Sequence, residues 1–95
     1  MFKLKVVTPN KIFYDKDAEM VIFKTTIGDR AILKGHVPIV AGIKAGKLKV
    51  KIDGKFHDAE IGKGFVTVDS DTNTVLVTEK AFWTEKAFWD EPYSE

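Results

Sequence analysis

Short runs of alternating apolar and polar residues, separated by turn residues, make up most of this sequence. The clearest run covers residues 47–52, where KLKVKI places three lysines on one face and three aliphatic side chains on the other. Alternate side chains of a β-strand point to opposite faces, so this period of two is typical of a half-buried strand. Asp53 and Gly54 follow directly, and this dipeptide favours the positive φ angles of a two-residue hairpin. Residues 47–61 are therefore predicted to form a β-hairpin.

Comparable runs recur from residue 2 to residue 78, and no segment shows the helical period. The expected strands are 2–6, 11–14, 18–25, 30–33, 39–43, 47–52, 55–61, 65–69 and 74–78. Residues 15–17 are expected to form a polar turn, and Gly62-Lys63-Gly64 a turn that needs glycine at positive φ. About eight to ten short strands with closely spaced turn signals predict an all-β sandwich or small barrel.

The composition excludes several classes of protein. The 95 residues are enough for one domain, and 15 basic against 14 acidic side chains leave a net charge of +1. A dedicated nucleic-acid-binding protein carries a much larger positive charge. The absence of cysteine excludes a disulfide framework and thiolate metal sites. No run approaches the roughly 18 consecutive apolar residues of a transmembrane helix, so direct insertion into a membrane is not expected.

Candidate catalytic and metal-binding residues are few. His36 and His57 lack HxxxH or HExxH spacing, and Ser70 and Ser94 do not stand in a GxSxG motif. We expect His36 to bond to the backbone in a turn and His57 to face solvent from a strand. No catalytic residue, metal site or cofactor is predicted.

A basic comb lies along the predicted central hairpin. Its members are Lys44, Lys47, Lys49, Lys51 and Lys55. Such a surface can meet phosphates, as in an OB-fold. Binding of single strands also needs stacking aromatics, and only Phe56 lies nearby. A solvated face that resists aggregation at the sheet edge is therefore favoured.

The hexapeptide TEKAFW occurs twice in succession, at 78–83 and 84–89. The block of polar and then apolar residues fits neither the helical period nor the strand period. The aromatic residues are too concentrated here to be incidental decoration of a chain terminus.

Several short motifs follow one another in a fixed order. They are LKVVTP at 4–9, GD at 28–29, AILKGHVPIV at 31–40, IKAGKLKV at 43–50, GKGFVTV at 62–68 and TVLVTEKA at 74–81. In this order and spacing they resemble the N-terminal domain of the epsilon subunit of F-type ATP synthase over residues 2–83. The GHxP turn followed by KxGxLxV and GxGFxxV is the most specific part of the resemblance.

The resemblance implies a flattened β-sandwich of about ten short, mostly antiparallel strands in the central stalk of a rotary enzyme. It implies two partners, the gamma subunit and the c ring, and coupling of ring rotation and proton or sodium transport to ATP synthesis. It also implies no catalysis by the subunit itself, and a peripheral position at the cytoplasmic face of the bacterial cell membrane as part of F1. Family members commonly continue into a C-terminal helical hairpin that inhibits ATP hydrolysis. We expect that hairpin to be absent, so its ATP binding and inhibition are not carried over.

The resemblance also divides the TEKAFW repeat into two unlike halves. It implies a domain over residues 1–83 and an aromatic tail over 84–95, where the helical hairpin would begin. Phe82 and Trp83 are expected to cap the sandwich, while Phe88 and Trp89 are candidates for self-association. Truncation after Trp83 is expected to leave the melting temperature nearly unchanged.

The resemblance also implies roles for individual positions. Asp29, with Arg30 beside it, matches the acidic position that faces the polar loops of the c ring. The positions matched to the gamma contact are Thr8, His36 and Ala41. The positions matched to the structural signature are Gly28, Gly35, Pro38, Gly46, Gly64 and Phe65. The chain departs from the usual pattern at Arg30, Ala31 and Lys34, which adds positive charge to the ring-facing loop.

Other functions compete with the stalk subunit. A free-standing β-sandwich module that forms homo-oligomers through the aromatic tail is the second hypothesis. An OB-like nucleic-acid-binding protein using the basic comb is the third. An enzyme comes last, because no catalytic constellation is present in the sequence.

Overall fold

The computed structural model describes residues 1–84, which form ten β-strands and no helix. The strands are β1 (Phe2–Val7), β2 (Ile12–Ala18), β3 (Met20–Thr25), β4 (Gly28–Leu33), β5 (Ile39–Ile43), β6 (Gly46–Ile52), β7 (Lys55–Ile61), β8 (Gly64–Val68), β9 (Thr74–Thr78) and β10 (Ala81–Trp83). The prediction of an all-β fold is confirmed.

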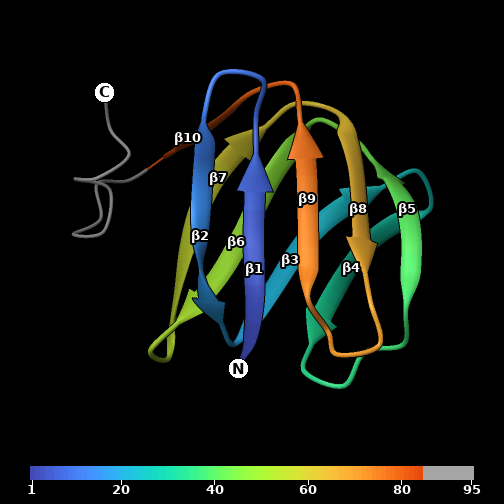
Figure 1. The fold of residues 1–95 in the computed structure, drawn as a ribbon. Coiled ribbons are helices and arrows are strands. Elements are labelled where there is room, and N and C mark those ends of the chain that lie inside the picture. The colour runs from blue at the N-terminus through green and yellow to red at the C-terminus, as the bar shows by residue number, and fades with distance from the viewer. Residues whose placement is uncertain (85–95) are drawn as a thin grey trace.

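The strands form two layers that pack face to face (Figure 1). One layer has the order β10-β7-β6-β3-β4, and the other has the order β5-β8-β9-β1-β2. The layers are joined where Thr25 of β3 pairs with Ile43 of β5. Strands β1 and β9 are parallel, and the other pairs are antiparallel. This is the flattened, mostly antiparallel sandwich that was predicted.

The core lies between the layers and consists of the inward-facing residues of both. In β6, Leu48 and Val50 are fully buried while Lys47 and Lys49 are exposed, as the alternation predicted. The largest fully buried side chains include Tyr14, Phe13, Phe23, Leu4, Ile32, Leu48 and Leu76. Each such apolar side chain contributes about 1.5–3 kcal/mol relative to exposure to water. Burial of one face of every strand therefore stabilises the two-layer arrangement.

The predicted hairpin between β6 and β7 is confirmed. Ile52 pairs with Lys55, so the loop consists of Asp53 and Gly54 alone. Their φ angles are 51° and 79°, the two positive values that a type I′ turn requires. The Gly54 amide also donates to Oε1 of Glu19 at 3.1 Å. The turn thereby fixes the register of β6 and β7, and with it the positions of the lysines in the basic comb.

The prediction of a turn at residues 15–17 is wrong, because these residues continue β2. Asp15 pairs with Lys5 and Asp17 pairs with Lys3 across the β1–β2 ladder. Opposite charges directly across an antiparallel ladder stabilise the pairing by about 0.2–1 kcal/mol. Pairing with β1 therefore overrides the low strand propensity of aspartate.

The expected turn of positive φ at residues 62–64 is also not observed. Gly64 begins β8 and pairs with Thr78, and neither it nor Gly62 has a positive φ. A side-chain carbon at Gly64 would collide with the carbonyl oxygen of Val77, and one at Gly62 would collide with the side chain of Glu79. Gly64 is therefore required for the close approach of the neighbouring backbone, whereas at Gly62 the flexible side chain of Glu79 would have to move. Positive φ is found instead at Gly28, Gly35 and Gly46.

A β-bulge near the start of β2 aims two aromatic side chains into the core. The register shifts between Val6, which faces Tyr14, and Val7, which faces Ile12. Phe13 is the extra residue, and a bulge turns neighbouring side chains away from strict alternation. Consecutive Phe13 and Tyr14 are consequently both buried.

The first TEKAFW copy belongs to the fold. Trp83 of β10 stacks on Phe13, with ring centroids 4.8 Å apart and planes at 28°, and meets the ring of Tyr14 edge-on at 6.0 Å. Trp83 therefore caps the core as predicted, whereas Phe82 points outward and is 54% exposed. Thr84 donates from its amide and its Oγ1 to the carbonyl oxygen of Asp58, both at 2.9 Å. The expectations for Phe88 and Trp89 concern residues outside the described part. Truncation after Trp83 also removes the described Thr84, and the loss of its two hydrogen bonds predicts a lower melting temperature in place of a nearly unchanged one.

Candidate partner-binding surfaces

The described residues offer little chemistry beyond binding. Within residues 1–84 there is no group of three or more His, Cys, Asp or Glu side chains placed to hold a metal ion. None of the described segments is a helix of the length and apolarity needed to cross a bilayer. Nδ1 of His36 lies 2.7 Å from the carbonyl oxygen of Val37, which confirms the expected bond to the backbone. The expectation that His57 faces solvent is wrong, because His57 alternates in phase with the buried Ala59 and Ile61 of β7 and is half-buried.

An apolar row crosses the outer face of the β5-β8-β9-β1-β2 layer. Cross-strand pairs join its members in the order Gly42, Phe65, Val77, Val7 and Ile12. Val40 and Val75 extend the row toward the other end of the strands, on either side of Thr67. We call the surface the apolar face; its residues are Val7, Ile12, Val40, Gly42, Phe65, Val75 and Val77.

The apolar face is accessible to a partner. Val40 is 79% exposed and Phe65 is 48% exposed, although both belong to regular, paired strands. Gly42 lies between them in the pattern and presents bare backbone, so an approaching surface can come close. Apolar residues that are contiguous and exposed on a rigid sheet mark interaction sites more often than scattered ones. Sequence reasoning missed this face, because its residues come from five strands whose order in the sheet is not visible in the sequence.

The outer face of the opposite layer is charged and largely self-compensated. Lys47 pairs across the ladder with Glu60, and its ammonium lies 3.7 Å from a carboxylate oxygen of Asp58. The ammonium of Lys51 lies 5.7 Å above the ring of Phe56. Exposed contacts of this kind contribute little to stability. The carboxylates of Asp58 and Glu60 balance part of the charge of the basic comb. A phosphate ligand would have to compete with the β7 carboxylates on this face.

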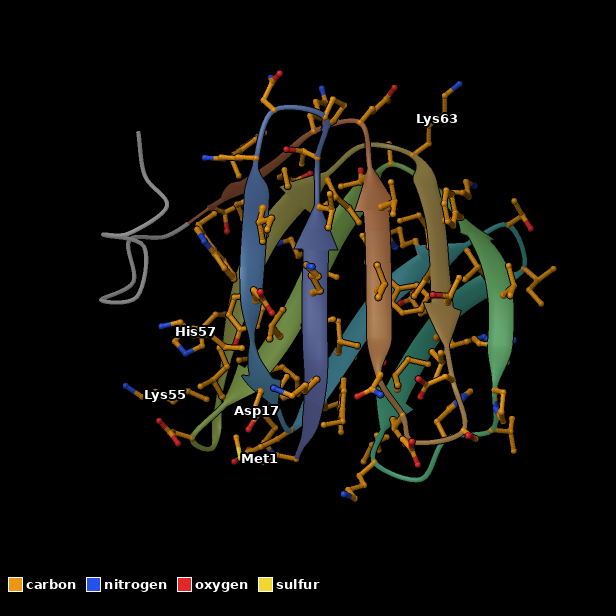
Figure 2. The ribbon with its side chains drawn as sticks, viewed as in Figure 1. Met1, Asp17, Lys55, His57 and Lys63 are labelled. Carbon is orange, nitrogen blue, oxygen red and sulfur yellow. The ribbon has the colours of Figure 1, made fainter. Side chains whose placement is uncertain are left out.

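The connections at the two ends of the sandwich differ in charge. The end that carries Lys63 also carries Lys11, Lys44 and Lys80, with one acid, Glu79 (Figure 2). The acids of the opposite end's connections are Glu19, Asp53, Asp69 and Asp71, and Lys34 is the single lysine there. We call these the basic end and the acidic end. Separation of charge along the strands orients the domain toward partners of opposite sign.

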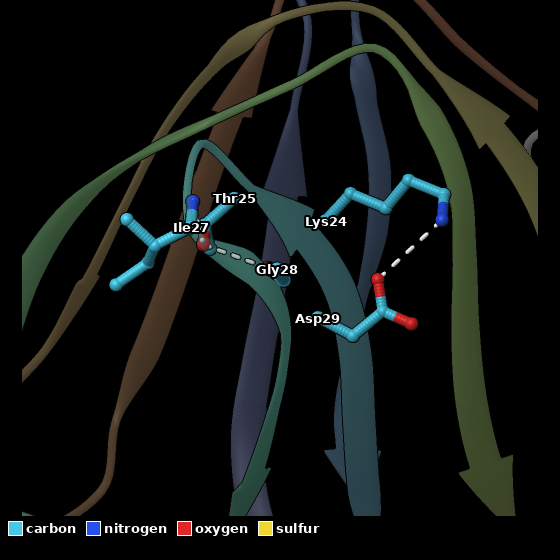
Figure 3. Close-up of polar contacts among 5 residues, drawn as sticks. All are labelled: Lys24, Thr25, Ile27, Gly28 and Asp29. Atoms are coloured by element: carbon cyan, nitrogen blue, oxygen red, sulfur yellow. Dashed lines mark hydrogen bonds and ion pairs between the residues drawn. The ribbon is translucent and has the colours of Figure 1, made fainter.

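The turn between β3 and β4 lies at the basic end and presents an apolar tip (Figure 3). Oγ1 of Thr25 donates to the carbonyl oxygen of Gly28 at 2.7 Å and accepts from the Ile27 amide at 3.2 Å. These bonds fix the turn, and the Ile27 side chain at its tip is 82% exposed. Next to the turn, the ammonium of Lys24 lies 3.4 Å from a carboxylate oxygen of Asp29.

The two predicted ring-contact residues do not share a face. Asp29 is exposed on the outer side of β4, where it pairs across the ladder with Lys24. Arg30 pairs with Phe23, is half-buried, and alternates to the other side of the strand. Both residues are close to Ile27 in the sequence, but only the side chain of Asp29 lies on the outer face of β4.

The three predicted gamma-contact residues are spread along the sandwich. Thr8 follows Val7 at the basic end, where its hydroxyl donates to the carbonyl oxygen of Lys11 at 3.0 Å. Ala41 lies in β5 and its side chain packs against the core. His36 lies at the acidic end, in the connection between β4 and β5. The apolar face occupies the surface between these positions, so its exposed side chains are better placed for contact than those of Thr8 and Ala41.

At the acidic end, two connections are tied together. The amide of Gly35 donates to Oγ1 of Thr72 at 2.9 Å, and Thr72 itself is buried with a φ of 64°. Oδ1 of Asp69 accepts from the amides of Asp71 and Asn73, and its Oδ2 accepts from the Asn73 side-chain amide at 3.0 Å. The side-chain bond from Asn73 is the main reason that the pKa of Asp69 lies below its ordinary value. This network holds the His36 loop in place.

The fold is that of a β-sandwich domain with an apolar face on one layer and a basic end. Residues 1–83 match the family described as the ATP synthase Delta/Epsilon chain, beta-sandwich domain. The chain belongs to this family.

Individual relatives agree with the family match. The ATP synthase epsilon chain of Ruminococcus albus is 46% identical over 83 residues, which are 87% of this chain and 62% of the relative. That of Alkaliphilus oremlandii is 44% identical over 82 residues, covering 86% and 60%. The chain therefore spans about 60% of the length of these relatives.

Solved structures share the fold. A chain in the Euglena gracilis mitochondrial ATP synthase (OSCP/F1/c-ring) has a TM-score of 0.81 at 21% identity, covering 93% of this chain and 56% of its own. A chain in the central stalk and c-ring structure of the Tetrahymena thermophila mitochondrial ATP synthase has a TM-score of 0.75 at 18% identity, covering 85% and 65%. At these sequence identities, the comparison shows a shared fold and nothing further.

Proposed function

We propose that this chain is the epsilon β-sandwich of the central stalk of an F-type ATP synthase. In this role it binds the gamma subunit and the c ring and couples ring rotation, with ion transport, to ATP synthesis without chemistry of its own. It is then peripheral, at the cytoplasmic face of the bacterial membrane, as part of F1. The observation that carries the proposal is the apolar face, which crosses every strand of one layer and is not covered by any other part of residues 1–84.

The apolar face is the proposed gamma-binding surface. A torque-bearing contact has to resist sliding, and a rigid sheet with a large exposed aromatic and aliphatic surface meets that need. Phe65 is the proposed central anchor, because it lies between Gly42 and Val77 in the row and large aromatic residues dominate binding energy at interfaces.

The basic end is the proposed ring-facing surface. It carries Asp29, which matches the ring-contact position of the family, together with the fixed Ile27 tip and the four lysines of the connections. Lysines dispersed around one end favour a polar or acidic partner by long-range attraction.

The test is formation of a one-to-one complex with the gamma subunit of a related ATP synthase, measured by size-exclusion chromatography. The variants Val40→Lys and Phe65→Lys place a charge on the apolar face and are expected to weaken the complex at least about tenfold. Phe82→Lys is the matched control, because Phe82 is a similarly exposed aromatic on the outer side of the opposite layer. It should leave the complex unchanged.

Failure of the unmodified chain to bind gamma at micromolar concentration would contradict the proposal. Loss of binding in Phe82→Lys but not in Phe65→Lys would keep the stalk role and move the interface to the other layer. Light scattering of the full chain and of residues 1–84 tests the second hypothesis, self-association through Phe88 and Trp89.

A further inference from the structure

Strand β10 occupies a binding site that is built from distant parts of the chain. Its backbone pairs with the edge of β7, where Ala81 faces Ile61 and Trp83 faces Ala59. The Trp83 indole covers the aromatic pair Phe13 and Tyr14, which the β2 bulge turns into the core. The site accepts a three-residue strand whose first and third side chains point inward and whose second points outward.

The sequence supplies a second segment with the same chemistry. Residues 84–89 repeat residues 78–83 without a change, so Ala87, Phe88 and Trp89 duplicate the three residues of β10. The two copies are six residues apart, and an even shift leaves every side chain on its original face. Ala87 and Trp89 would therefore point inward and Phe88 outward.

We propose that the β7 edge, with Phe13 and Tyr14, is a binding site for either copy, and that Ala87-Phe88-Trp89 of the same chain is its second ligand. Exchange replaces one Ala-Phe-Trp strand by an identical one and keeps the ten-strand fold. The first copy is then displaced into the connection between β9 and β10, which lies at the basic end. The repeat thus gives the domain two registers of its last strand.

Two features favour the first copy in the unmodified chain. In the observed register the connection from Thr78 to Ala81 consists of residues 79 and 80, whereas the second register needs residues 79–86. A fourfold longer connection closes roughly eight times less readily. In addition, Thr84 donates two hydrogen bonds to the carbonyl oxygen of Asp58, and Asp90 would take its place. An ionised aspartate side chain has no proton to donate.

The exchange is tested by weakening the first copy in the full-length chain and asking whether the second rescues it. The variant set is Trp83→Ala, Trp89→Ala and the double variant, with thermal unfolding as the first readout. The double variant is expected to lower the melting temperature by at least about 12 °C, the loss typical of a tryptophan removed from a core of this size. Trp83→Ala should lose less than half of that, and Trp89→Ala no more than about 2 °C.

Fluorescence identifies the residue in the site, because the chain has only two tryptophans. In Trp83→Ala the remaining fluorophore is Trp89, and in Trp89→Ala it is Trp83. Exchange predicts that both variants emit at the same short wavelength and are quenched by acrylamide at rates within about twofold of each other, because the same site shields them. The variant Trp83→Asp provides a second test, since a buried charge excludes the first copy more strongly.

Two results would overturn the proposal. One is a Trp83→Ala variant that melts as low as the double variant while Trp89 emits as an indole in water. The other is a rescue whose melting temperature rises with protein concentration, since that would place the second copy of another chain in the site. Neither readout involves the gamma subunit, so both outcomes are independent of the proposed stalk role.

Discussion

Glycine residues allow neighbouring strands of this sandwich to approach closely. Gly64 is the sharpest case, because a side-chain carbon there would collide with the backbone of Val77 in the neighbouring strand. We expect Gly64→Ala to destabilise the domain by roughly 1–3 kcal/mol, the usual cost of overpacking when backbone has to move. Gly42→Ala is the matched control, since a side-chain carbon at Gly42 meets only the Gly64 carbonyl oxygen, at 4.0 Å. Urea unfolding compares the two; equal stability of both variants would contradict the collision.

Asp69 links stability to pH at the acidic end. Its folded pKa lies below the ordinary 3.8, first because of the side-chain bond from Asn73 and then because of the backbone bond from the same residue. A carboxylate with a lowered folded pKa contributes stability above its ordinary pKa, and the contribution is lost as the pH falls through the folded value. Asp69→Asn is therefore expected to lower the urea midpoint between pH 5 and pH 7, with a difference from the unmodified chain that shrinks toward pH 3. A difference that grows on acidification would contradict this sign.

The sequence showed which single residues matter for the structure more reliably than it showed the structural reason. The glycines at 62 and 64 were correctly singled out but wrongly assigned to positive φ, because a close approach between β8 and β9 depends on a pairing that sequence does not show. Asp29 and Arg30 were grouped by adjacency, although adjacent residues of a strand face opposite sides. Gly54 was predicted correctly, because a two-residue hairpin is a local structure.

Among the elements, β10 is the last strand that the structure describes. The two hydrogen bonds from Thr84 to Asp58 add one residue to the part that β7 holds. We expect a chain ending at Thr84 to melt within about 2 °C of the full chain, and a chain ending at Trp83 to melt about 4–8 °C lower, which corresponds to about 1 kcal/mol. Differential scanning calorimetry of both truncations checks this. Equal melting temperatures would show that the two hydrogen bonds of Thr84 do not stabilise the domain.

The locations of most strands were predictable from the sequence, but their pairing partners and registers were not. The alternation in β1 and β6 follows from one buried face, so both strands were found from their patterns. The β2 strand was cut short, because Asp15 and Asp17 belong there only through their lysine partners on β1. The parallel pairing of β1 with β9 and the bulge at Phe13 arise from long-range register, which no local pattern encodes.

The same limit explains why the candidate site was only partly predicted. The resemblance to the epsilon family led to Thr8, His36 and Ala41, but their side chains bond to backbone or pack inward. The residues of the apolar face are exposed in β2, β5 and β8 and half-buried in β1 and β9, and these five strands are adjacent in space but scattered in sequence. The apolar face therefore became visible only when the strands were placed in order.

At the scale of the whole molecule, the two proposed interfaces rely on different interactions. The salt dependence of binding can therefore distinguish them. The gamma contact relies on apolar side chains such as Phe65, whose burial does not weaken with ionic strength. The ring contact relies on dispersed lysines, whose attraction is screened over about 10 Å at 0.1 M salt and about 3 Å at 1 M.

Raising sodium chloride from 0.05 M to 0.5 M is expected to change the dissociation constant of the gamma complex less than about twofold and to weaken binding to isolated c rings at least about tenfold. A Lys44→Glu, Lys63→Glu double variant should weaken ring binding already at low salt and leave the gamma complex intact. Biolayer interferometry with immobilised gamma or detergent-solubilised rings measures both constants on the same protein. A gamma complex that dissociates in salt, or ring binding indifferent to it, would show that the two surfaces have been assigned to the wrong partners.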